Sequence, residues 1–205
     1  MSTSIASPDE HRDDEASKLG MWLFIFTELL LFGGLFITYS VYRYMHQEAF
    51  HLAAQELDVV MGTINTVILL VSSMTIAMST TAIQKKDKKT TLILIGITMV
   101  LALVFLINKY FEWSGKISHG LYPGSQLLHD LGQGDTLFFG LYFFMTGLHA
   151  VHIIVGMVIL GFIFVFVWKD KLTFDNFQLL ENGGLYWHLV DLIWIFLFPL
   201  FYLIT

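Results

Sequence analysis

Long runs of apolar residues separated by short polar segments dominate the pattern of this chain. Five runs are long enough to cross a hydrocarbon core of about 30 Å as a helix, which needs about 20 residues. They cover residues 19–42, 59–83, 91–113, 136–168 and 185–204. The pattern therefore predicts an all-α integral membrane bundle of five transmembrane helices, which forms a single domain over residues 18–205.

Three further segments complete the predicted organisation. Residues 1–17 lack the basic start and apolar core of a signal peptide, so we expect a disordered polar tail outside the membrane. As a helix, residues 136–168 would extend about 50 Å at about 1.5 Å per residue, so we expect one tilted helix that projects past the bilayer. Residues 114–135 carry Pro-Gly and Gly-rich turn signals, which predict an ordered external loop.

The distribution of basic residues predicts the orientation, because Lys and Arg collect on the cytoplasmic side of membrane proteins. If the N-terminus is cytoplasmic, the outer half carries Arg43, Lys109 and Lys116, and the remaining basic residues lie in inner segments. The sequence QKKDKK at residues 84–89 is the densest of these segments. We therefore predict a cytoplasmic N-terminus and a periplasmic C-terminus.

The composition agrees with a membrane protein and restricts its chemistry. Hydrophobic residues make up 56% of the chain and charged residues only 14%. Cysteine is absent, which excludes disulfides, thiolate metal sites and cysteine nucleophiles. The net charge of -6 gives no sign of nucleic-acid binding.

Small polar residues recur at a helical spacing in the second run. They form two series with a period of seven residues: Asn65, Ser72 and Ser79, and then Thr66, Ser73 and Thr80. Seven residues make nearly two helical turns, so all six side chains share one face. Because small polar residues permit close helix approach and interhelical hydrogen bonds, we interpret this face as a helix-packing stripe in preference to a conduction path.

Ionisable residues occur inside three of the runs, where a carboxylate near the bilayer centre costs about 2.5 to 3.5 kcal/mol. Glu28 lies in the first run, His149 and His152 in the fourth, and His188 and Asp191 in the fifth. Each pair is three residues apart and so shares one helical face. Counting residues from the ends of the runs places these groups in the cytoplasmic half, so we predict one intramembrane polar cluster with a role in lipid contact or proton uptake.

The same histidines also suggest a metal-site hypothesis, with Asp191 or Glu28 as a further ligand. Two observations oppose it. None of the five runs contains the Glu-x-x-His motif of di-metal carboxylate bundles, and the runs hold too few histidines for haem ligation by facing pairs. We therefore expect no metal ligands in this chain, and hydrogen bonds from these histidines to neighbouring groups.

Five motifs, one from each run in chain order, together indicate a family. They are KLGMWLFIFTELLLFGGLF, NTVILLVSSMT, YFEW, MTGLHAVHIIVG and YWHLVDLIW. In this order the chain resembles subunit III of the haem-copper oxidases, in the short five-helix bacterial form. The resemblance covers nearly all of residues 18–202, and the short form lacks two N-terminal helices that wall a lipid cleft in longer members.

The resemblance implies an accessory, non-catalytic subunit of an oxidoreductase complex in the bacterial cytoplasmic membrane. Such a subunit binds no haem or copper, contacts oxidase subunit I directly, assembles with subunit II and other respiratory subunits, and holds structural phospholipid. The glutamate that matches Glu28 is associated with proton uptake and turnover stability. The histidines that match His149, His152 and His188 are not redox-metal ligands.

Several functional hypotheses stay open on the sequence. The main one is subunit III of a bacterial cytochrome c oxidase, and the alternative is the homologous subunit of a quinol oxidase or nitric oxide reductase complex. The segment KYFEWSGKISHGLYPGS resembles bacterial branches that include subunits associated with nitric oxide reductase. Two other classes are an independent His-ligated metal protein and a proton channel. Metal analysis of the purified chain tests the first of these, and proton flux in liposomes tests the second.

Overall fold

The computed structural model describes residues 8–173 and 176–204, and its long elements are all helices. They are α1 (Pro8–Met45), α2 (Gln47–Gln55), α3 (Val59–Gln84), α4 (Lys88–Ser118), α5 (Gln126–Leu131), α6 (Gln133–Trp168) and α7 (Gln178–Tyr202). Within the described residues, the five helices other than α2 and α5 are long and apolar enough to cross a membrane. The predicted all-α fold with five spanning helices is confirmed.

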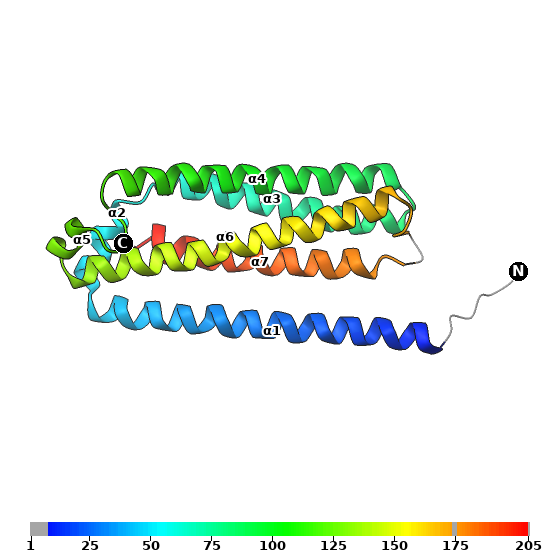
Figure 1. The fold of residues 1–205 in the computed structure, drawn as a ribbon, viewed down its shortest axis with the longest axis horizontal. Coiled ribbons are helices and arrows are strands. Elements are labelled where there is room, and N and C mark those ends of the chain that lie inside the picture. The colour runs from blue at the N-terminus through cyan, green and yellow to red at the C-terminus, as the bar shows by residue number, and fades with distance from the viewer. Residues whose placement is uncertain (1–7, 174–175, 205) are drawn as a thin grey trace, which may run out of the picture.

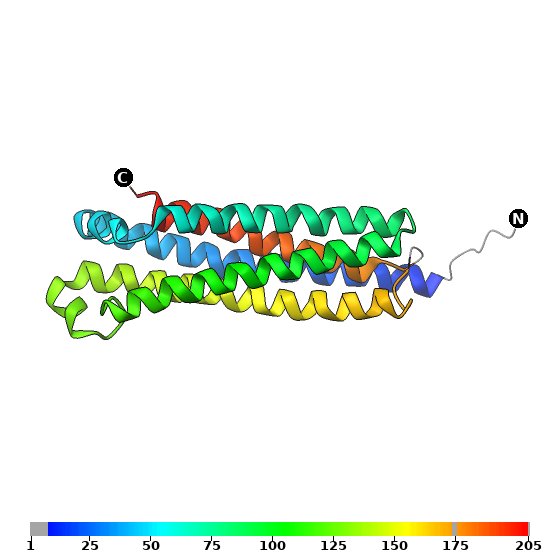
Figure 2. The ribbon, with the colours of Figure 1, turned by 90° about the horizontal axis from the view of Figure 1, so that it is seen from above.

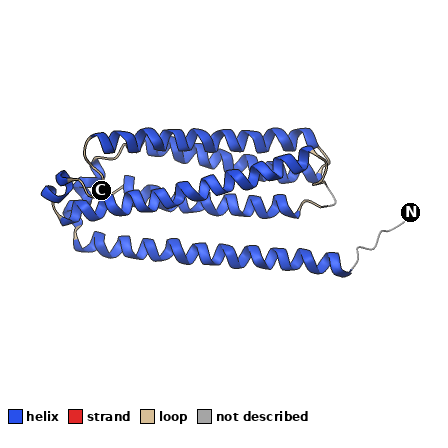
Figure 3. Ribbon diagram, viewed as in Figure 1, coloured by secondary structure: helices blue, strands red, loops and turns tan. Residues whose placement is uncertain are grey.

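The five long helices lie side by side along one axis (Figure 1). In this view α3 and α4 lie at one edge, α6 and α7 in the middle, and α1 at the opposite edge. The short helices α2 and α5 gather at the end where α7 finishes, and Figure 2 shows the same grouping from above. We call this the α2–α5 end, and the opposite one the α3–α4 end; loops are confined to these two ends (Figure 3).

Helix α1 begins earlier than the sequence predicted. Residues 8–17 of the expected polar tail are helical, and residues 1–7 lie outside the described part of the chain. Proline is tolerated in the first turn of a helix, where a backbone N–H would have no intrahelical acceptor. A polar segment can therefore extend a membrane helix beyond its apolar run.

The predicted fourth run forms one helix, α6, whose 36 residues correspond to about 54 Å at about 1.5 Å per residue. The segment expected to be an ordered external loop, residues 114–135, contains the short helix α5. Ser125 caps α5, because its hydroxyl accepts a hydrogen bond from the Leu128 N–H at 3.2 Å. Gly120 and Gly124 before it adopt positive φ angles of 75° and 92°, which fits the turn signals in the sequence.

Aspartate caps start two of the spanning helices. The Asp58 carboxylate accepts hydrogen bonds from the Val60 and Met61 N–H groups at the start of α3. The Asp87 carboxylate caps α4 by accepting hydrogen bonds from the Thr90 hydroxyl and N–H. These hydrogen bonds lower the pKa of Asp87. The contribution of this cap to stability is therefore present above the pKa of the unfolded chain and is lost as the pH falls through the lowered pKa.

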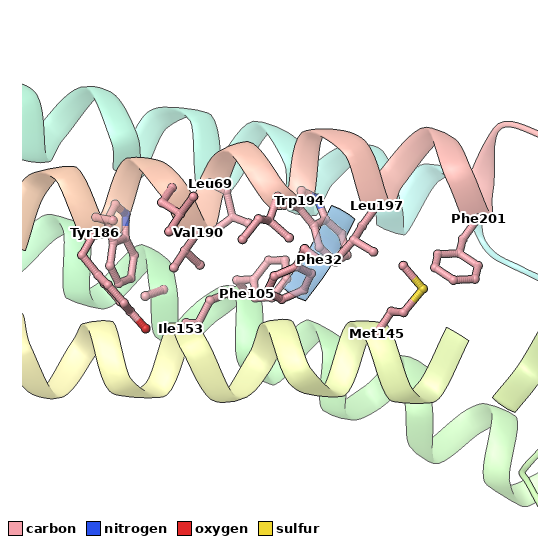
Figure 4. Close-up of a cluster of buried hydrophobic side chains, with 14 of the residues drawn as sticks. Phe32, Leu69, Phe105, Met145, Ile153, Tyr186, Val190, Trp194, Leu197 and Phe201 are labelled. Atoms are coloured by element: carbon pink, nitrogen blue, oxygen red, sulfur yellow. The ribbon is translucent and has the colours of Figure 1, made fainter. Parts of the chain in front are cut away.

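The core is built around α7. In the most apolar stretch of each helix, 56% of the α7 residues are buried, against 11% for α1. Figure 4 shows side chains from five helices converging beside α7. Fully buried members include Phe32, Leu69, Phe105, Ile153 and Trp194, which come from α1, α3, α4, α6 and α7 in that order.

Helix α1 is attached through one narrow seam. Its buried side chains Ile25, Phe32 and Tyr39 recur every seven residues. Aromatic rings supply much of the contact: Tyr39 meets Phe201 of α7 with ring centroids 5.0 Å apart. Most of the remaining apolar surface of α1 is exposed, so it is available to lipid or to another protein chain.

Close packing between α6 and α7 depends on Gly156. A Cβ built on Gly156 would lie 2.8 Å from the Trp187 ring, which is fully buried. Gly156→Ala should therefore destabilise the bundle by about 1–2 kcal/mol, because overpacking costs about 1–3 kcal/mol and the gain in helix propensity recovers only about 0.5–1 kcal/mol. Thermal unfolding of the full chain in mild detergent measures this loss.

Gly96→Ala is the matched control, because a Cβ on Gly96 of α4 meets no atom within 4 Å. This variant should be as stable as the wild type or slightly more stable. Equal stability of the two alanine variants would contradict the packing role of Gly156.

Candidate functional site

An acidic residue and a histidine meet where α1 contacts α6. The Glu28 Oε2 atom lies 2.9 Å from His152 Nε2, and the two side chains are 14% and 13% exposed. On the other side of the ring, His152 Nδ1 lies 2.7 Å from the Leu148 carbonyl oxygen. A carbonyl oxygen can only accept, so Nδ1 carries a proton and the tautomer of the ring is fixed.

This geometry leaves one proton between the two side chains. Because Nδ1–H is fixed, a single further proton completes the bond between Nε2 and Oε2, and either Glu28 or His152 can hold it. The pair is neutral overall in both arrangements. It can therefore shift a proton between α1 and α6 without placing a net charge in the membrane.

Aromatic groups hold the pair in place. The Phe32 ring lies edge-on to the His152 ring with centroids 5.4 Å apart. The Tyr186 hydroxyl donates to the His152 carbonyl oxygen at 3.0 Å, and the Tyr186 ring stacks on Phe24 of α1. Residues of three helices thus hold the pair, which is only slightly exposed.

His149, one turn away on α6, is not part of this pair. Its side chain is fully buried, and neither ring nitrogen has a hydrogen-bond partner among the described residues. The ring instead packs between Phe105 and Trp194, with centroid distances of 5.7 and 5.1 Å. His152 therefore makes the hydrogen bonds that were expected, and His149 makes none. The offset of three residues along α6 directs the His149 ring into the aromatic core.

The other two predicted residues lie between α3 and α7. His188 Nδ1 is 2.7 Å from the Ser73 hydroxyl. Asp191 is 3% exposed and lies close to Ser73, but neither carboxylate oxygen has a hydrogen bond of normal geometry within the described chain. The five residues predicted as one cluster thus occupy two separate helix contacts, with His149 in the core.

The polar stripe of α3 faces its neighbouring helices. Trp187 Nε1–H donates to the Ser72 hydroxyl at 3.0 Å, and Trp194 Nε1–H donates to the Thr66 hydroxyl at 3.0 Å. The Asn108 side chain of α4 donates to Asn65 Oδ1 at 2.9 Å. The Ser79 and Thr80 hydroxyls bond to the Ile76 carbonyl of their own helix. With Ser73, four of the six residues of the stripe therefore hydrogen-bond side chains of α4 or α7.

A buried ion pair near the α2–α5 end was not predicted from the sequence. Lys109 Nζ lies 3.1 Å from Glu112 Oε2 within α4, and the side chains are only 3% and 4% exposed. The ammonium also donates to the Tyr142 and Tyr202 hydroxyls at 3.1 and 2.7 Å. Both hydroxyls donate to Glu112 Oε1, at 2.6 and 2.5 Å.

This network joins α4 to α6 and α7 and leaves no donor of the ammonium group without an acceptor. Lys109 Nζ further lies 5.2 Å from the Trp194 ring centroid, a cation–π distance. The sequence signal was a Lys and a Glu three residues apart at the end of the third run. That signal does not distinguish a buried pair from charges at the membrane surface.

Candidate metal ligands do not converge. Within the described residues, no group of three or more His, Cys, Asp or Glu side chains is placed to hold a metal ion. The histidines instead contact a carboxylate, a hydroxyl and aromatic rings.

Comparisons with known proteins identify related chains. The family model described as cytochrome c oxidase subunit III matches residues 12–205. Cytochrome c oxidase subunit 3 of Thermostichus vulcanus is 32% identical over 99% of this chain and 94% of its own length. The probable quinol oxidase subunit 3 of Staphylococcus saprophyticus is 29% identical over 92% of this chain and 89% of its own length.

A third relative is much longer. The heme-copper oxidase subunit I+III of Aeropyrum pernix is 30% identical over 91% of this chain, which corresponds to 22% of that protein. In that protein the region similar to this chain is therefore part of a longer polypeptide.

The Lys109 network predicts a large difference between single and double substitutions. Lys109→Met leaves the Glu112 carboxylate buried without its counter-charge, which should cost about 3–5 kcal/mol of unfolding free energy. Lys109→Met combined with Glu112→Gln should recover most of that loss, because the tyrosines can still donate to the amide oxygen. Unfolding of the full chain in bicelles by increasing SDS measures both values.

Lys88→Met serves as the control, since Lys88 forms an ion pair with Asp170 whose side chains are 41% and 71% exposed. Breaking this surface pair should cost about 1 kcal/mol or less. A double variant as unstable as Lys109→Met alone would contradict the role of charge pairing in the buried network.

Proposed function

The chain belongs to the cytochrome c oxidase subunit III family, and from this membership we propose that it is the accessory, non-catalytic subunit of a bacterial cytochrome c oxidase. The chain is a multi-pass membrane protein and a haem-copper oxidase subunit III. The match over residues 12–205 carries the proposal, since it includes all five spanning helices. Its role would be to support assembly, proton uptake and turnover stability of the catalytic subunit.

The Glu28–His152 pair supplies the chemistry of this proposal. The pair is neutral, so it can stay in the membrane without a counter-ion, and it gains or loses a proton only by becoming charged. Such a change is favourable only when a nearby group in a partner compensates the charge. We therefore propose that the pair exchanges protons in step with charge changes in an adjoining subunit.

The position of the pair supports an interaction with a partner. It lies on α1, the spanning helix with the smallest buried fraction. We propose oxidase subunit I as the direct partner, with subunit II and other respiratory subunits in the same complex. The Aeropyrum pernix relative, whose name combines subunits I and III, supports a close association of the two.

A phospholipid role is part of the same proposal. A pocket of about 460 Å³ at the α3–α4 end is lined by Lys18 and Trp22 of α1, by α3, and by Asn182 and His188 of α7. A lysine beside an indole ring at the end of a spanning helix suits a lipid headgroup. Haem and copper would reside in the partner subunits.

The location follows from the same features. We propose the bacterial cytoplasmic membrane, with the N-terminus cytoplasmic and the C-terminus periplasmic. Helix α1 begins and helix α7 ends at opposite ends of the bundle (Figure 1). The lysine-rich turn between α3 and α4 lies at the end where α1 begins, and we assign that end to the cytoplasm.

A quinol oxidase complex is the second candidate. It is favoured by the similarity to the probable quinol oxidase subunit 3 of Staphylococcus saprophyticus. The two candidates differ in the electron donor, which the partner subunits bind. Oxygen consumption by the co-purified complex with reduced cytochrome c or with quinol distinguishes them.

Removal of this chain should leave the remaining oxidase assembled but shorten its active lifetime during turnover. We expect the remaining oxidase to keep its haem and copper spectra and its initial turnover, and to lose activity several-fold sooner during continuous turnover. Optical spectra and oxygen consumption over time measure these properties. Loss of the haem spectrum on deletion, or haem bound stoichiometrically to the isolated chain, would overturn the accessory role.

Glu28→Gln tests the proton pair inside the assembled enzyme. The amide can still hydrogen-bond His152 but cannot carry the exchangeable proton, so assembly should be normal while proton uptake or turnover lifetime falls. Combining it with His152→Asn should add little, because the two side chains act as one unit.

Asp58→Asn provides a control that removes a carboxylate at the start of α3 and keeps a helix cap. Its proton uptake and turnover lifetime should equal those of the wild type. Normal kinetics and lifetime in Glu28→Gln would assign Glu28 to packing alone.

A further inference from the structure

Asp191 of α7 is a buried carboxyl group without a hydrogen-bond partner. Its side chain is 3% exposed, and neither carboxyl oxygen is hydrogen-bonded within the described residues. Asp191 lies thirteen residues after Gln178, the first residue of α7, which is about 20 Å along the helix axis. The carboxyl group is therefore well inside the apolar bundle.

The other acidic, basic and histidine side chains inside the bundle contact groups other than Asp191. Glu28 of α1 contacts His152 of α6, Lys109 of α4 contacts Glu112, and His149 of α6 packs between aromatic rings. Helix α3, which packs closely on α7, contains no ionisable residue, and the group it places beside Asp191 is the neutral Ser73 hydroxyl. An ionised carboxylate is costly inside a membrane unless a cation compensates it, so we expect Asp191 to carry a proton.

The pocket at the α3–α4 end leads toward this carboxyl group. It has a volume of about 460 Å³ and follows one face of α7, where its lining residues recur every three or four positions: Gln178, Glu181 and Asn182, Leu185, and His188. Asp191 is the next residue on this face, about one turn beyond His188. The pocket thus ends one helical turn before the buried carboxyl group.

The Ser73 hydroxyl of α3 lies between the end of the pocket and Asp191. It is 2.7 Å from His188 Nδ1, and it also lies beside the Asp191 carboxyl group. A hydroxyl can donate one hydrogen bond and accept another, so it can receive a proton from one neighbour while it gives its own proton to the other. His188, Ser73 and Asp191 are therefore arranged in the order that proton transfer from the pocket to the interior requires.

We propose that Asp191 is a proton-storage site that exchanges its proton with the pocket through Ser73 and His188. On release, the Asp191 proton passes to the Ser73 oxygen while the Ser73 proton passes to His188 Nδ1, and His188 gives the proton on its other ring nitrogen to solvent in the pocket. The reverse steps refill the site, and only protons move. This site lies between α3 and α7, separate from the Glu28–His152 pair, and it does not depend on the accessory role.

Infrared spectroscopy of the full chain in mild detergent tests the protonation state at neutral pH, where an exposed aspartate is ionised. Asp191→Asn should remove one carbonyl band of a protonated carboxyl group. The amide has nearly the shape of the protonated acid, so this variant should keep the thermal stability of the wild type. Asp58→Asn is the control, because Asp58 is exposed at the start of α3, and its replacement should leave the band unchanged.

Transfer into D2O tests the path, because the carbonyl band shifts when deuterium replaces the carboxyl proton. Ser73→Ala and His188→Leu should keep the band but slow its shift about tenfold or more, since positioned acid–base groups speed proton transfer by about 10²–10⁴-fold. Ser73→Thr keeps the hydroxyl and should exchange at the wild-type rate. Ser79→Ala is the matched control on α3, because the Ser79 hydroxyl donates to the Ile76 carbonyl of its own helix, and its exchange should also be that of the wild type.

Three results would overturn the proposal. The first is an unchanged carboxyl spectrum in Asp191→Asn, which would mean that Asp191 is ionised in the folded chain. The second is a loss of thermal stability in Asp191→Asn with normal stability in Asp58→Asn, which would indicate a negative charge that a cation compensates. The third is exchange at the wild-type rate in both Ser73→Ala and His188→Leu, which would place the route to Asp191 elsewhere.

Discussion

Hydrocarbon offers no hydrogen-bond partner, so polar groups within the spanning helices must be satisfied inside the protein. The helical backbone meets this requirement for itself, and α7 meets it for several side chains, whereas His149 and Asp191 have no hydrogen-bond partner within the described residues. Its two indole N–H groups, from Trp187 and Trp194, bond hydroxyls of α3. Near its end, Tyr202 joins the Lys109–Glu112 pair of α4. These bonds fix α7 between α3, α4 and α6, which explains why α7 is the most buried span.

Helix α1 is much less buried than α7, and the proposed function depends on this exposure. Its contact with the bundle is a seam of aromatic side chains and one polar pair, Glu28–His152. The rest of its apolar surface faces away from the described chain. We propose that this pair responds to charge in a neighbouring subunit, because α1 is the least enclosed helix, whereas the Lys109 network is enclosed by α4, α6 and α7.

The candidate site was only partly predictable. Spacing indicated that Glu28, His152, His188 and Asp191 are polar residues within the apolar runs, and the structure places them at contacts between helices. The prediction grouped these residues by their depth along the spanning helices. Depth does not specify which neighbouring helix each side chain faces. On α6, His152 faces α1 and His149 faces the aromatic core. The residues predicted as one cluster therefore lie in three places: Glu28 with His152, His188 with Ser73 near Asp191, and His149 among aromatic rings.

The sequence by itself determined the number of spanning helices and the family, because length and ordered motifs are properties of a single chain. It also supplied the residues of the buried ion pair without revealing their burial. Only the tertiary structure decided which polar groups meet, because the partners in these interhelical hydrogen bonds lie 43 to 124 residues apart in the chain. Glu112, which the sequence placed only in a motif, thus became part of a closed network once α6 and α7 packed against α4.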